Sequence, residues 1–317
     1  MKRSPAMVGA LAALVTVGIW TAFIIIARAS ASHTLLPQDI VFTRLLGAGA
    51  VLLPWALWRT RIVPAPGAGR GSLGGLSPLP LGLTLRLGLL GGVMYALLSY
   101  SGFFFAPASH ASVLLPGSLP LWTSLLAWWW LAERFGRARL LGLLLIVAGD
   151  LLVGGRSLLE AFDGGQVWRG DLLFMAASLS WSAYTVLVRR HHLDAVQATM
   201  ATTAMAFVVF VPLHLLGSNL LGMPSRLLQA PWSELLFQAL FQGVGSVVIS
   251  GITFVMMVRH FGPVRSTMIT ALVPGLSALG AVLLLGEPLS WQLLAGLVLV
   301  SLGIVAGVWL GRPGRAA

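Results

Sequence analysis

The sequence predicts an all-α integral membrane protein of ten transmembrane helices arranged as two inverted five-helix repeats, and three observations carry this prediction. The first is composition, because 57% of the 317 residues are hydrophobic and only 9% are charged, whereas soluble domains carry about 25% charged residues. The second is a series of apolar stretches of membrane-spanning length. The third is a sequence repeat between the two halves of the chain. So few charges cannot cover a water-facing surface of this size, so most of it is expected to contact membrane lipid.

The apolar stretches are each close to the roughly 20 residues that cross a bilayer. We expect spans at 7–27, 39–58, 85–105, 110–131, 138–155, 170–188, 196–217, 234–258, 264–285 and 291–310. The first follows two basic residues, as a signal peptide would, but its length fits a full span. Most connectors are short. The longest, 59–84, is rich in Gly and Pro and is expected to be irregular, and 156–169 is expected to be a second long connector.

Basic residues fall unevenly between alternate connectors, and this predicts the orientation. The connectors on the N-terminal side of the membrane, with the two termini, contain Lys2, Arg3, Arg59, Arg61, Arg70, Arg86, Arg134, Arg137, Arg139, Arg189, Arg190, Arg259, Arg265, Arg312 and Arg315. The other connectors contain only Arg28, Arg156, Arg169 and Arg226. Because positive charge is retained in the cytoplasm, we expect a multi-pass protein of the plasma (inner) membrane with both termini cytoplasmic.

An internal repeat relates residues 1–156, the first half, to residues 157–317, the second half. At an offset of 154, four positions match: Pro120 with Pro274, Glu133 with Glu287, Gly142 with Gly296, and Gly149 with Gly303. At an offset of 161, Trp20 matches Trp181 and Arg28 matches Arg189. Each half has five predicted spans, and an odd number places the second half upside down in the membrane. Inverted repeats of this kind are typical of secondary transporters.

At these residues the chain resembles the EamA family of the drug/metabolite transporter superfamily. The resemblance covers nearly the whole chain and includes Gly170-Asp171, Ser180-Trp181-Ser182-Ala183-Tyr184 and Gly286-Glu287-Pro288. The first copy departs from the last of these motifs, with Ala132-Glu133-Arg134. The resemblance implies ten helices, two inverted repeats, a central cavity and export of a metabolite or amino acid. It does not determine the cargo, because these motifs are shared by members with different cargo.

Small and polar residues recur at helical spacing on predicted spans one, three, six and eight, so they share helix faces. From these stripes we predict a substrate-binding site formed by Thr16, Trp20, Tyr95, Ser99, Ser178, Trp181, Thr185, Ser246 and Ser250, together with Arg44. Glycines on the stripes favour close helix packing instead. For the two tryptophans the alternative is anchoring at the membrane interface. Tyr100 lies off the main stripe.

Arg44 is the one charge several residues inside a predicted span. An ionisable residue there is a candidate functional group, and a guanidinium suits a substrate carboxylate. The alternatives are snorkelling towards the nearer interface, or pairing with Asp39 or another carboxylate.

The carboxylates are expected near the ends of the spans, with none at mid-membrane. Asp150 and Asp171 are expected to pair with Arg156, Arg169 or Arg28, and proton coupling is the alternative for these two acids. Glu133 and Glu287 fall at opposite membrane faces, near helix N-termini, and are expected to be structural. Three prolines fall inside predicted spans four and nine and are expected to bend them: Pro116, Pro120 and Pro274.

Together these features favour a secondary transporter that moves a small polar metabolite, with an amino acid as the expected cargo and export as the expected direction. The alternatives are an efflux carrier for drugs or other hydrophobic compounds and an integral-membrane lipid enzyme or scramblase. The chain has no cysteine and no P-loop motif, and its six histidines form no metal or nucleophile pattern. We therefore expect no catalytic site, metal or cofactor, and no nucleic-acid partner. The motifs leave the oligomeric state open.

Overall fold

The chain folds into packed helices, and the computed structural model describes residues 5–62, 71–133 and 136–309. Within these ranges there is no strand, only an isolated bridge between Ser72 and Ser77. The all-helical prediction is confirmed.

The first half contains α1 (Pro5–Ser30), α2 (Pro37–Leu57), η1 (Trp58–Ile62), η2 (Leu73–Gly75), α3 (Leu81–Leu87), η3 (Gly88–Met94), α4 (Tyr95–Phe103), α5 (Ala108–Leu114), α6 (Leu119–Leu131), α7 (Arg137–Glu160) and η4 (Ala161–Asp163). The second half contains α8 (Val167–Arg190), α9 (Ala195–Leu220), α10 (Trp232–Gln238), η5 (Ala239–Ile249), α11 (Ser250–Thr270), α12 (Leu272–Leu285) and α13 (Trp291–Trp309). Segments η1, η3 and η5 are π-helical continuations of longer helices.

Eight helical runs among the described residues are long and apolar enough to cross a membrane: Met7–Ser30, Pro37–Arg61, Leu81–Phe103, Ala108–Leu131, Arg139–Asp163, Val167–Arg190, Ala195–Leu220 and Trp232–Phe261. Two shorter apolar helices, Leu272–Leu285 and Trp291–Gly307, follow them. The protein is therefore a multi-pass membrane protein, and the count of exactly ten spans stays a prediction. The predicted ninth span differs because α11 continues to Thr270, so only α12 stands as a separate apolar helix.

The predicted connector 156–169 is partly wrong, because α7 continues to Glu160. Apolar Leu158 and Leu159 extend the hydrophobic run. Arg156 Nε donates to Glu160 Oε1 at 2.7 Å across one helical turn, a spacing that supports a helix end.

At the predicted bends in spans four and nine, the helix is interrupted rather than kinked. Helix α5 ends at Leu114 and α6 begins at Leu119, with Pro116 between them and Pro120 in the first turn of α6. In the second half Pro274 lies in the first turn of α12, after a turn at Ala271. Proline has no N–H to donate to the preceding turn, so it is tolerated at the start of a helix and interrupts its interior.

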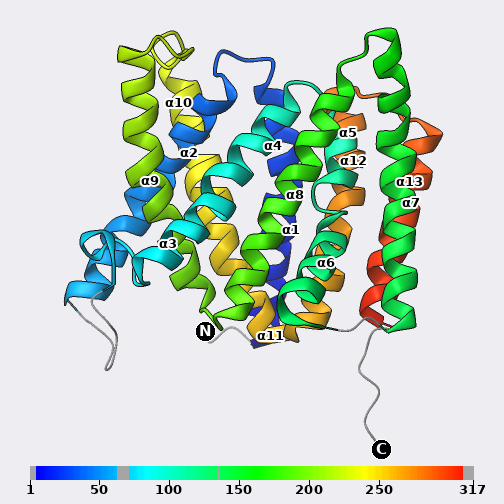
Figure 1. Cartoon of the computed structure of the whole chain (residues 1–317), viewed down its shortest axis with the longest axis horizontal. Helices are drawn as coiled ribbons and strands as arrows, with labels where there is room; N and C mark the ends of the chain where they lie inside the picture. Colours follow the sequence, from blue (N-terminus) through cyan, green and yellow to red (C-terminus); the bar gives the residue numbers. More distant parts are fainter. Residues whose placement is uncertain (1–4, 63–70, 134–135, 310–317) are drawn as a thin grey trace, which may run out of the picture.

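The connections between helices are divided between the two ends of the bundle. Helix α1 begins and α13 ends at the lower face in Figure 1, which also contains the α6–α7 and α8–α9 connections. Arg137, Arg139, Arg189 and Arg190 lie at or beside these connections. The upper face contains the α4–α5, α7–α8 and α12–α13 connections. Six residues used to predict orientation, and the side chain of Arg265, lie outside the described residues: Lys2, Arg3, Arg70, Arg134, Arg312 and Arg315.

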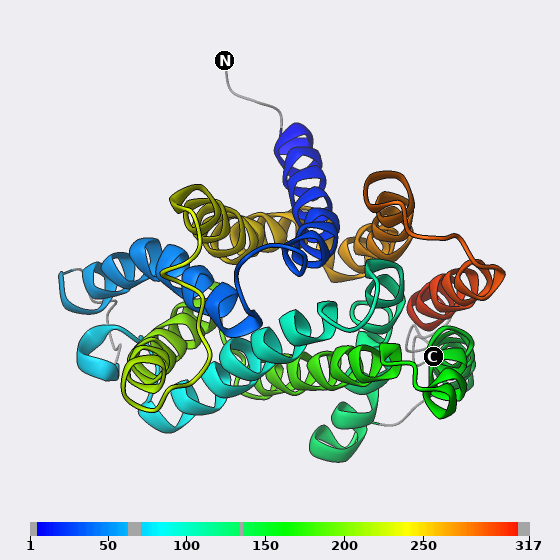
Figure 2. The ribbon, with the colours of Figure 1, turned by 90° about the horizontal axis from the view of Figure 1, so that it is seen from above.

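Helices α7 and α13 make the most extensive contact between any two helices and lie side by side at one edge of the bundle (Figures 1 and 2). Glycine allows their close approach, since a Cβ on Gly142 would lie 2.6 Å from the carbonyl oxygen of Gly303. A Cβ on Gly149 would lie 2.7 Å from the carbonyl oxygen of Gly296. Each of these glycines thus opposes a glycine of the other half, as expected for helix packing in lipid.

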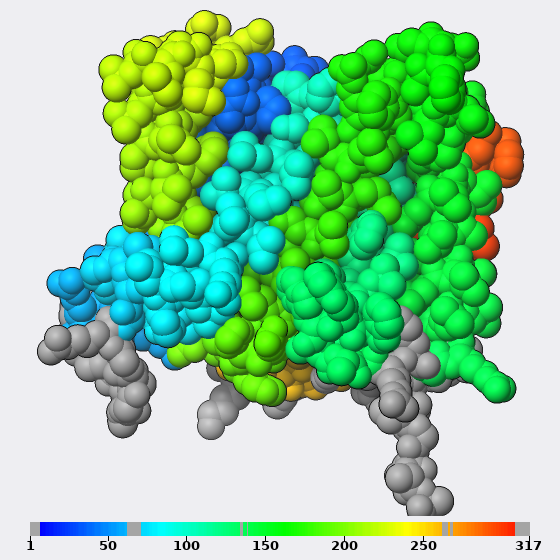
Figure 3. Space-filling model, in the orientation of Figure 1, coloured from blue at the N-terminus to red at the C-terminus, as the bar shows by residue number. Residues whose placement is uncertain are grey.

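The outer surface of the bundle is apolar. Leu14, Leu159, Leu220 and Leu283 are among many exposed large hydrophobic residues. Figure 3 shows the side chains of α3, α6, α7 and α9 closing over one broad side of the molecule. An exposed apolar surface of this extent is suited to lipid rather than water.

Two ion pairs join the halves crosswise, one at each face. At the upper face Arg28 Nε of the first half lies 3.8 Å from Glu287 Oε1 of the second. At the lower face Arg189 Nη2 of the second half lies 2.5 Å from Glu133 Oε1 of the first. The two arginines are matched in the repeat, and so are the two glutamates.

Candidate functional site

The guanidinium of Arg44 lies between helices of both halves. Its Nη1 donates to Tyr100 Oη of α4 at 3.1 Å and to Ser246 Oγ of η5 at 3.4 Å. Its Cζ lies 5.8 Å from the ring centroid of Phe23 on α1 and 6.0 Å from that of Tyr100. All nine acidic side chains are described, and none forms an ion pair with Arg44. The charge is held by hydroxyls and aromatic faces alone.

Close packing of α2 against η5 positions Arg44 beside Ser246. A Cβ on Gly243 would lie 2.7 Å from the carbonyl oxygen of Arg44 and from the nitrogen of Ala48. A Cβ on Gly47 would lie 1.9 Å from the carbonyl oxygen of Ala239. Only glycine at these positions allows the two backbones to approach this closely.

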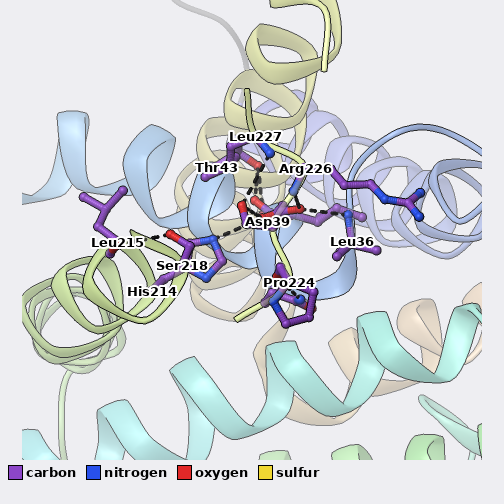
Figure 4. Close-up of polar contacts among 12 residues, drawn as sticks. Leu36, Asp39, Thr43, His214, Leu215, Ser218, Pro224, Arg226 and Leu227 are labelled. Atoms are coloured by element: carbon purple, nitrogen blue, oxygen red, sulfur yellow. Dashed lines mark hydrogen bonds and ion pairs between the residues drawn. The ribbon is translucent and has the colours of Figure 1, made fainter. Parts of the chain in front are cut away.

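Asp39 does not pair with Arg44, because both of its carboxylate oxygens are bonded to other groups (Figure 4). Its Oδ1 accepts from Ser225 Oγ at 2.7 Å and lies 3.0 Å from His214 Nε2. Its Oδ2 accepts from the backbone nitrogens of Leu36 at 3.1 Å and Arg226 at 2.9 Å. This fully buried carboxylate joins the start of α2 to the end of α9 and to the segment that follows.

Two tryptophans that match in the repeat each contact an aromatic side chain of the other half. Trp20 of α1 stacks on Phe254 of α11, with ring centroids 5.3 Å apart. Trp181 of α8, its partner in the repeat, contacts Tyr95 of α4 with centroids 4.7 Å apart. Tyr184 extends the second cluster, 5.0 Å from Trp181. Each tryptophan thus contacts an aromatic ring of the opposite half, inside its helix rather than at an end.

The predicted hydroxyls mostly bond within their own helices. Thr16 donates to Ala12 O at 2.8 Å and also meets Thr253 Oγ1 at 2.8 Å. Ser178 accepts from Ser118 Oγ at 2.9 Å. Three further bonds go to backbone carbonyls of the same helix: Ser99 to Tyr95 at 2.8 Å, Thr185 to Trp181 at 2.9 Å and Ser250 to Ser246 at 2.7 Å.

Burial divides the predicted site residues into two groups. Four are buried within the bundle: Thr16, Ser99, Ser178 and Ser250. Six are partly accessible: Trp20, Arg44, Tyr95, Trp181, Thr185 and Ser246. The second group contains the charge, the aromatic rings and the hydroxyl that bonds to Arg44. A pocket of about 330 Å³ lies at the α2–α3 connector, lined by Thr60, Arg61 and Ser72, away from both groups.

Tyr100 is the site residue that the helical stripe missed. It is buried and bonds directly to Arg44, and its ring makes an edge contact with Phe23 at 5.9 Å. It follows Tyr95 by five residues, which places it on a different face of an ideal helix. The available signal was composition, since all three tyrosines fall on predicted spans three and six.

The expected pairing of Asp150 and Asp171 with arginines is wrong. Asp171 instead lies 3.0 Å from His110 Nδ1 and accepts a short hydrogen bond from Ser157. Asp150 has no hydrogen-bond partner at either oxygen. It lies close to the middle of the span Arg139–Asp163, because α7 continues beyond the predicted end at 155. A carboxylate thus lies near the midpoint of this helical run, further from its end than expected.

The fold and the polar centre define the protein as a multi-pass, all-helical membrane protein of two related halves. The chain belongs to the EamA-like transporter family, whose model matches it twice, at residues 7–155 and 168–308. It is accordingly a transporter rather than an enzyme. The resemblance to this family is confirmed, and so is the two-repeat architecture.

Individual relatives agree with this assignment. The chain is 28% identical over 250 residues to a protein of Salmonella typhimurium (strain LT2) named "Probable amino-acid metabolite efflux pump", covering 75% of this chain and 78% of that protein. It is 27% identical over 184 residues to an "Uncharacterized transporter" of Archaeoglobus fulgidus, covering 57% of this chain and 58% of that protein. A solved crystal structure with 21% identity matches 99% of this chain and 100% of its own with a TM-score of 0.60, which shows the shared fold.

Proposed function

We propose that this protein is a secondary transporter that exports a small polar metabolite bearing a carboxylate, such as an amino acid, across the inner membrane. The observation that carries the proposal is Arg44, a guanidinium inside a membrane span with no ion-pair partner among the acidic residues. A charge inside a membrane span is costly unless it is paired, and a substrate carboxylate supplies the missing charge. The relative named as an amino-acid metabolite efflux pump supports the same class of cargo.

The surroundings of Arg44 suit a carboxylate. The guanidinium is a planar fork that binds two carboxylate oxygens through parallel hydrogen bonds. One nitrogen, Nη1, is already oriented by Tyr100 and Ser246, so little side-chain freedom is lost when the cargo binds. The rings of Trp20 and Trp181 offer apolar faces to the rest of a small molecule.

Alternating access by two inverted five-helix halves, 1–156 and 157–317, is the mechanism we propose. In this interpretation the end of α11 and α12 together form the ninth of ten spans, and both termini are cytoplasmic. The crossed pairs Arg28–Glu287 and Arg189–Glu133 support it, because one lies at each face and rocking the halves strains them in opposite senses. The helix breaks before Pro120 and Pro274 supply bending points in matched positions.

Counterflow into proteoliposomes tests the proposal. Vesicles loaded with unlabelled amino acid are diluted into the labelled form, and each amino acid is compared with its amide, which lacks the carboxylate. We expect saturable uptake of one class of amino acid and none of its amide. Loss of a charge-assisted bidentate contact predicts that Arg44→Ala lowers uptake by about 10- to 100-fold.

Arg44→Lys is the matched control, because it keeps the charge and loses the fork, and we expect it to recover part of the uptake. Uptake of amide and acid alike, with Arg44→Ala fully active, would refute the carboxylate site. Transport of hydrophobic cations alone would instead favour drug efflux, with the cluster of Tyr95, Trp181 and Tyr184 as its binding surface.

A further inference from the structure

Asp150 is a carboxylate to which no group in the described part of the chain is hydrogen-bonded. It lies near the middle of the span Arg139–Asp163 and is 7% exposed. Neither Oδ1 nor Oδ2 has a hydrogen-bond partner. A carboxylate ion in hydrocarbon without a partner is strongly unfavourable, whereas the neutral acid loses only hydrogen bonds to water. In this conformation Asp150 is therefore best accommodated with a proton bound.

The elements packed against α7 supply no compensating positive charge. Helices α13 and α6 contain no titratable residue within their bounds. On α5 the titratable group is His110, which is engaged by Asp171 of α8. The remaining titratable or charged residues of α8, α7 and η4 lie towards the ends of these elements or, for Tyr184, in the aromatic cluster: Arg169, Tyr184, Arg189, Arg190, Arg137, Arg139, Arg156, Glu160 and Asp163.

A polar stripe leads from Asp150 to the upper face. Gly154 and Ser157 follow at spacings of four and seven residues and so share its side of α7. Ser157 donates to Asp171, and a Cβ on Gly154 would lie 3.9 Å from Asp171 Oδ2. Asp171 in turn contacts His110 near the top of α5. The helical rise from Ser157 to Asp150 is about 10 Å, a gap that water has to enter before a proton can pass.

The stripe also faces the broken helix. A Cβ on Gly154 would lie 3.9 Å from Leu114, the last residue of α5 before the break. The first turn of α5 is bound by the other half of the chain, because Glu287 accepts from the nitrogens of Ala108 at 2.7 Å and Ser109 at 2.8 Å. Admitting water to ionise Asp150 therefore requires α7 to separate from a neighbouring helix. Its contacts with α8 and α13 join the two halves, and α5 is itself bonded to the second half through Glu287.

From this geometry we propose that Asp150 is the proton-binding site that couples export to the proton gradient, with His110, Asp171 and Ser157 as the path from the upper face. This inference rests on the proposed function. One proton is taken up by the carboxylate from the upper side, is carried as the neutral acid while the halves close, and is released to the lower side. The cargo moves in the opposite direction, so one proton enters for each cargo exported.

Infrared spectroscopy of the protein in lipid nanodiscs tests the proton site without any cargo. At neutral pH we expect the carbonyl band of a protonated carboxylic acid in the wild type. The band is lost in Asp150→Asn and is kept in Asp163→Asn, the matched control, because Asp163 is exposed at the upper end of the same span. A wild type without the band, or a band that persists in Asp150→Asn, would overturn the proposal whatever the cargo proves to be.

Transport measurements test coupling. In vesicles one pH unit more acidic inside, exchange of one proton per cargo accumulates labelled amino acid up to about tenfold. We expect Asp150→Asn to abolish this accumulation while counterflow stays within about twofold of wild type, because the neutral side chain still permits closure. Equal accumulation by the wild type and Asp150→Asn would refute coupling at Asp150. So would wild-type counterflow that is the same with and without the pH gradient. Failure of all counterflow with an intact infrared band would refute the proposed cargo instead.

Discussion

Arg44 and Asp150 are both ionisable residues inside membrane spans without an opposite charge, yet their surroundings differ completely. Arg44 is partly accessible, with two hydroxyl partners and two aromatic faces. Asp150 is buried, and neither of its oxygens has a hydrogen-bond partner among the described residues. The difference follows from chemistry, because arginine cannot give up its charge in a protein, whereas a carboxylate loses its charge by binding a proton. Inside the membrane an arginine therefore needs polar neighbours, whereas a carboxylate needs only access to a proton, which neutralises it.

The largest effect is expected where the backbone that holds Arg44 is disturbed. Gly243→Ala places a Cβ 2.7 Å from backbone atoms of Arg44 and Ala48, so α2 and η5 must separate. Overpacking of this kind costs about 1–3 kcal/mol, and we expect counterflow to be lost together with a lower thermal midpoint. Gly245→Ala is the control on the same segment, since its nearest contact is 3.6 Å away. Equal activity of the two variants would contradict the close contact that positions Arg44.

Stability measurements compare the two ionisable residues directly. Asp150→Leu removes an unsatisfied buried polar group, and we expect a gain of about 1–3 kcal/mol in the free energy of unfolding. Arg44→Leu leaves Tyr100 and Ser246 without their partner, and we expect a loss of about 1 kcal/mol. Denaturation of both variants and the wild type in the same detergent shows whether each substitution raises or lowers the free energy of unfolding. A loss for both would mean that Asp150 has a stabilising partner.

The smallest effect is expected at Tyr100. Tyr100→Phe keeps the ring beside Arg44 and removes one hydrogen bond, which is worth about 1 kcal/mol and so raises KM roughly fivefold. Tyr95→Phe is the control, because Tyr95 contributes a ring contact to Trp181 and no hydrogen bond to Arg44. Concentration-dependent counterflow distinguishes the two. An unchanged KM in Tyr100→Phe would show that the hydroxyl does not orient the guanidinium.

Features that depend on local composition were predictable from the sequence. Hydropathy placed most helices within a few residues, and the repeat indicated two related halves. Arg44 was identifiable as a charge inside an apolar run. The glycines of α7 and α13 behave as packing residues, as the need for close helix approach in lipid suggests.

Features that depend on where a helix ends, or on which face meets which neighbour, were not predictable. Gly154, Gly155 and Arg156 interrupt the apolar run of α7, so the sequence predicts Asp150 near its outer end. The helix continues to Glu160, and this moves Asp150 to the middle of the span. Tyr100 does lie on a different face of α4 from Tyr95. This second face meets Arg44 because of how α4 packs against α2, which helical spacing alone does not predict.

The bond between Glu287 and the start of α5 has a consequence for how the protein is made. The two residues that close this contact, Ala108 and Glu287, are 179 positions apart. While the ribosome is still producing the second half, the first amides of α5 have no carboxylate to receive them. The contact that fixes the start of α5 can therefore form only after the connection between α12 and α13 has been synthesised.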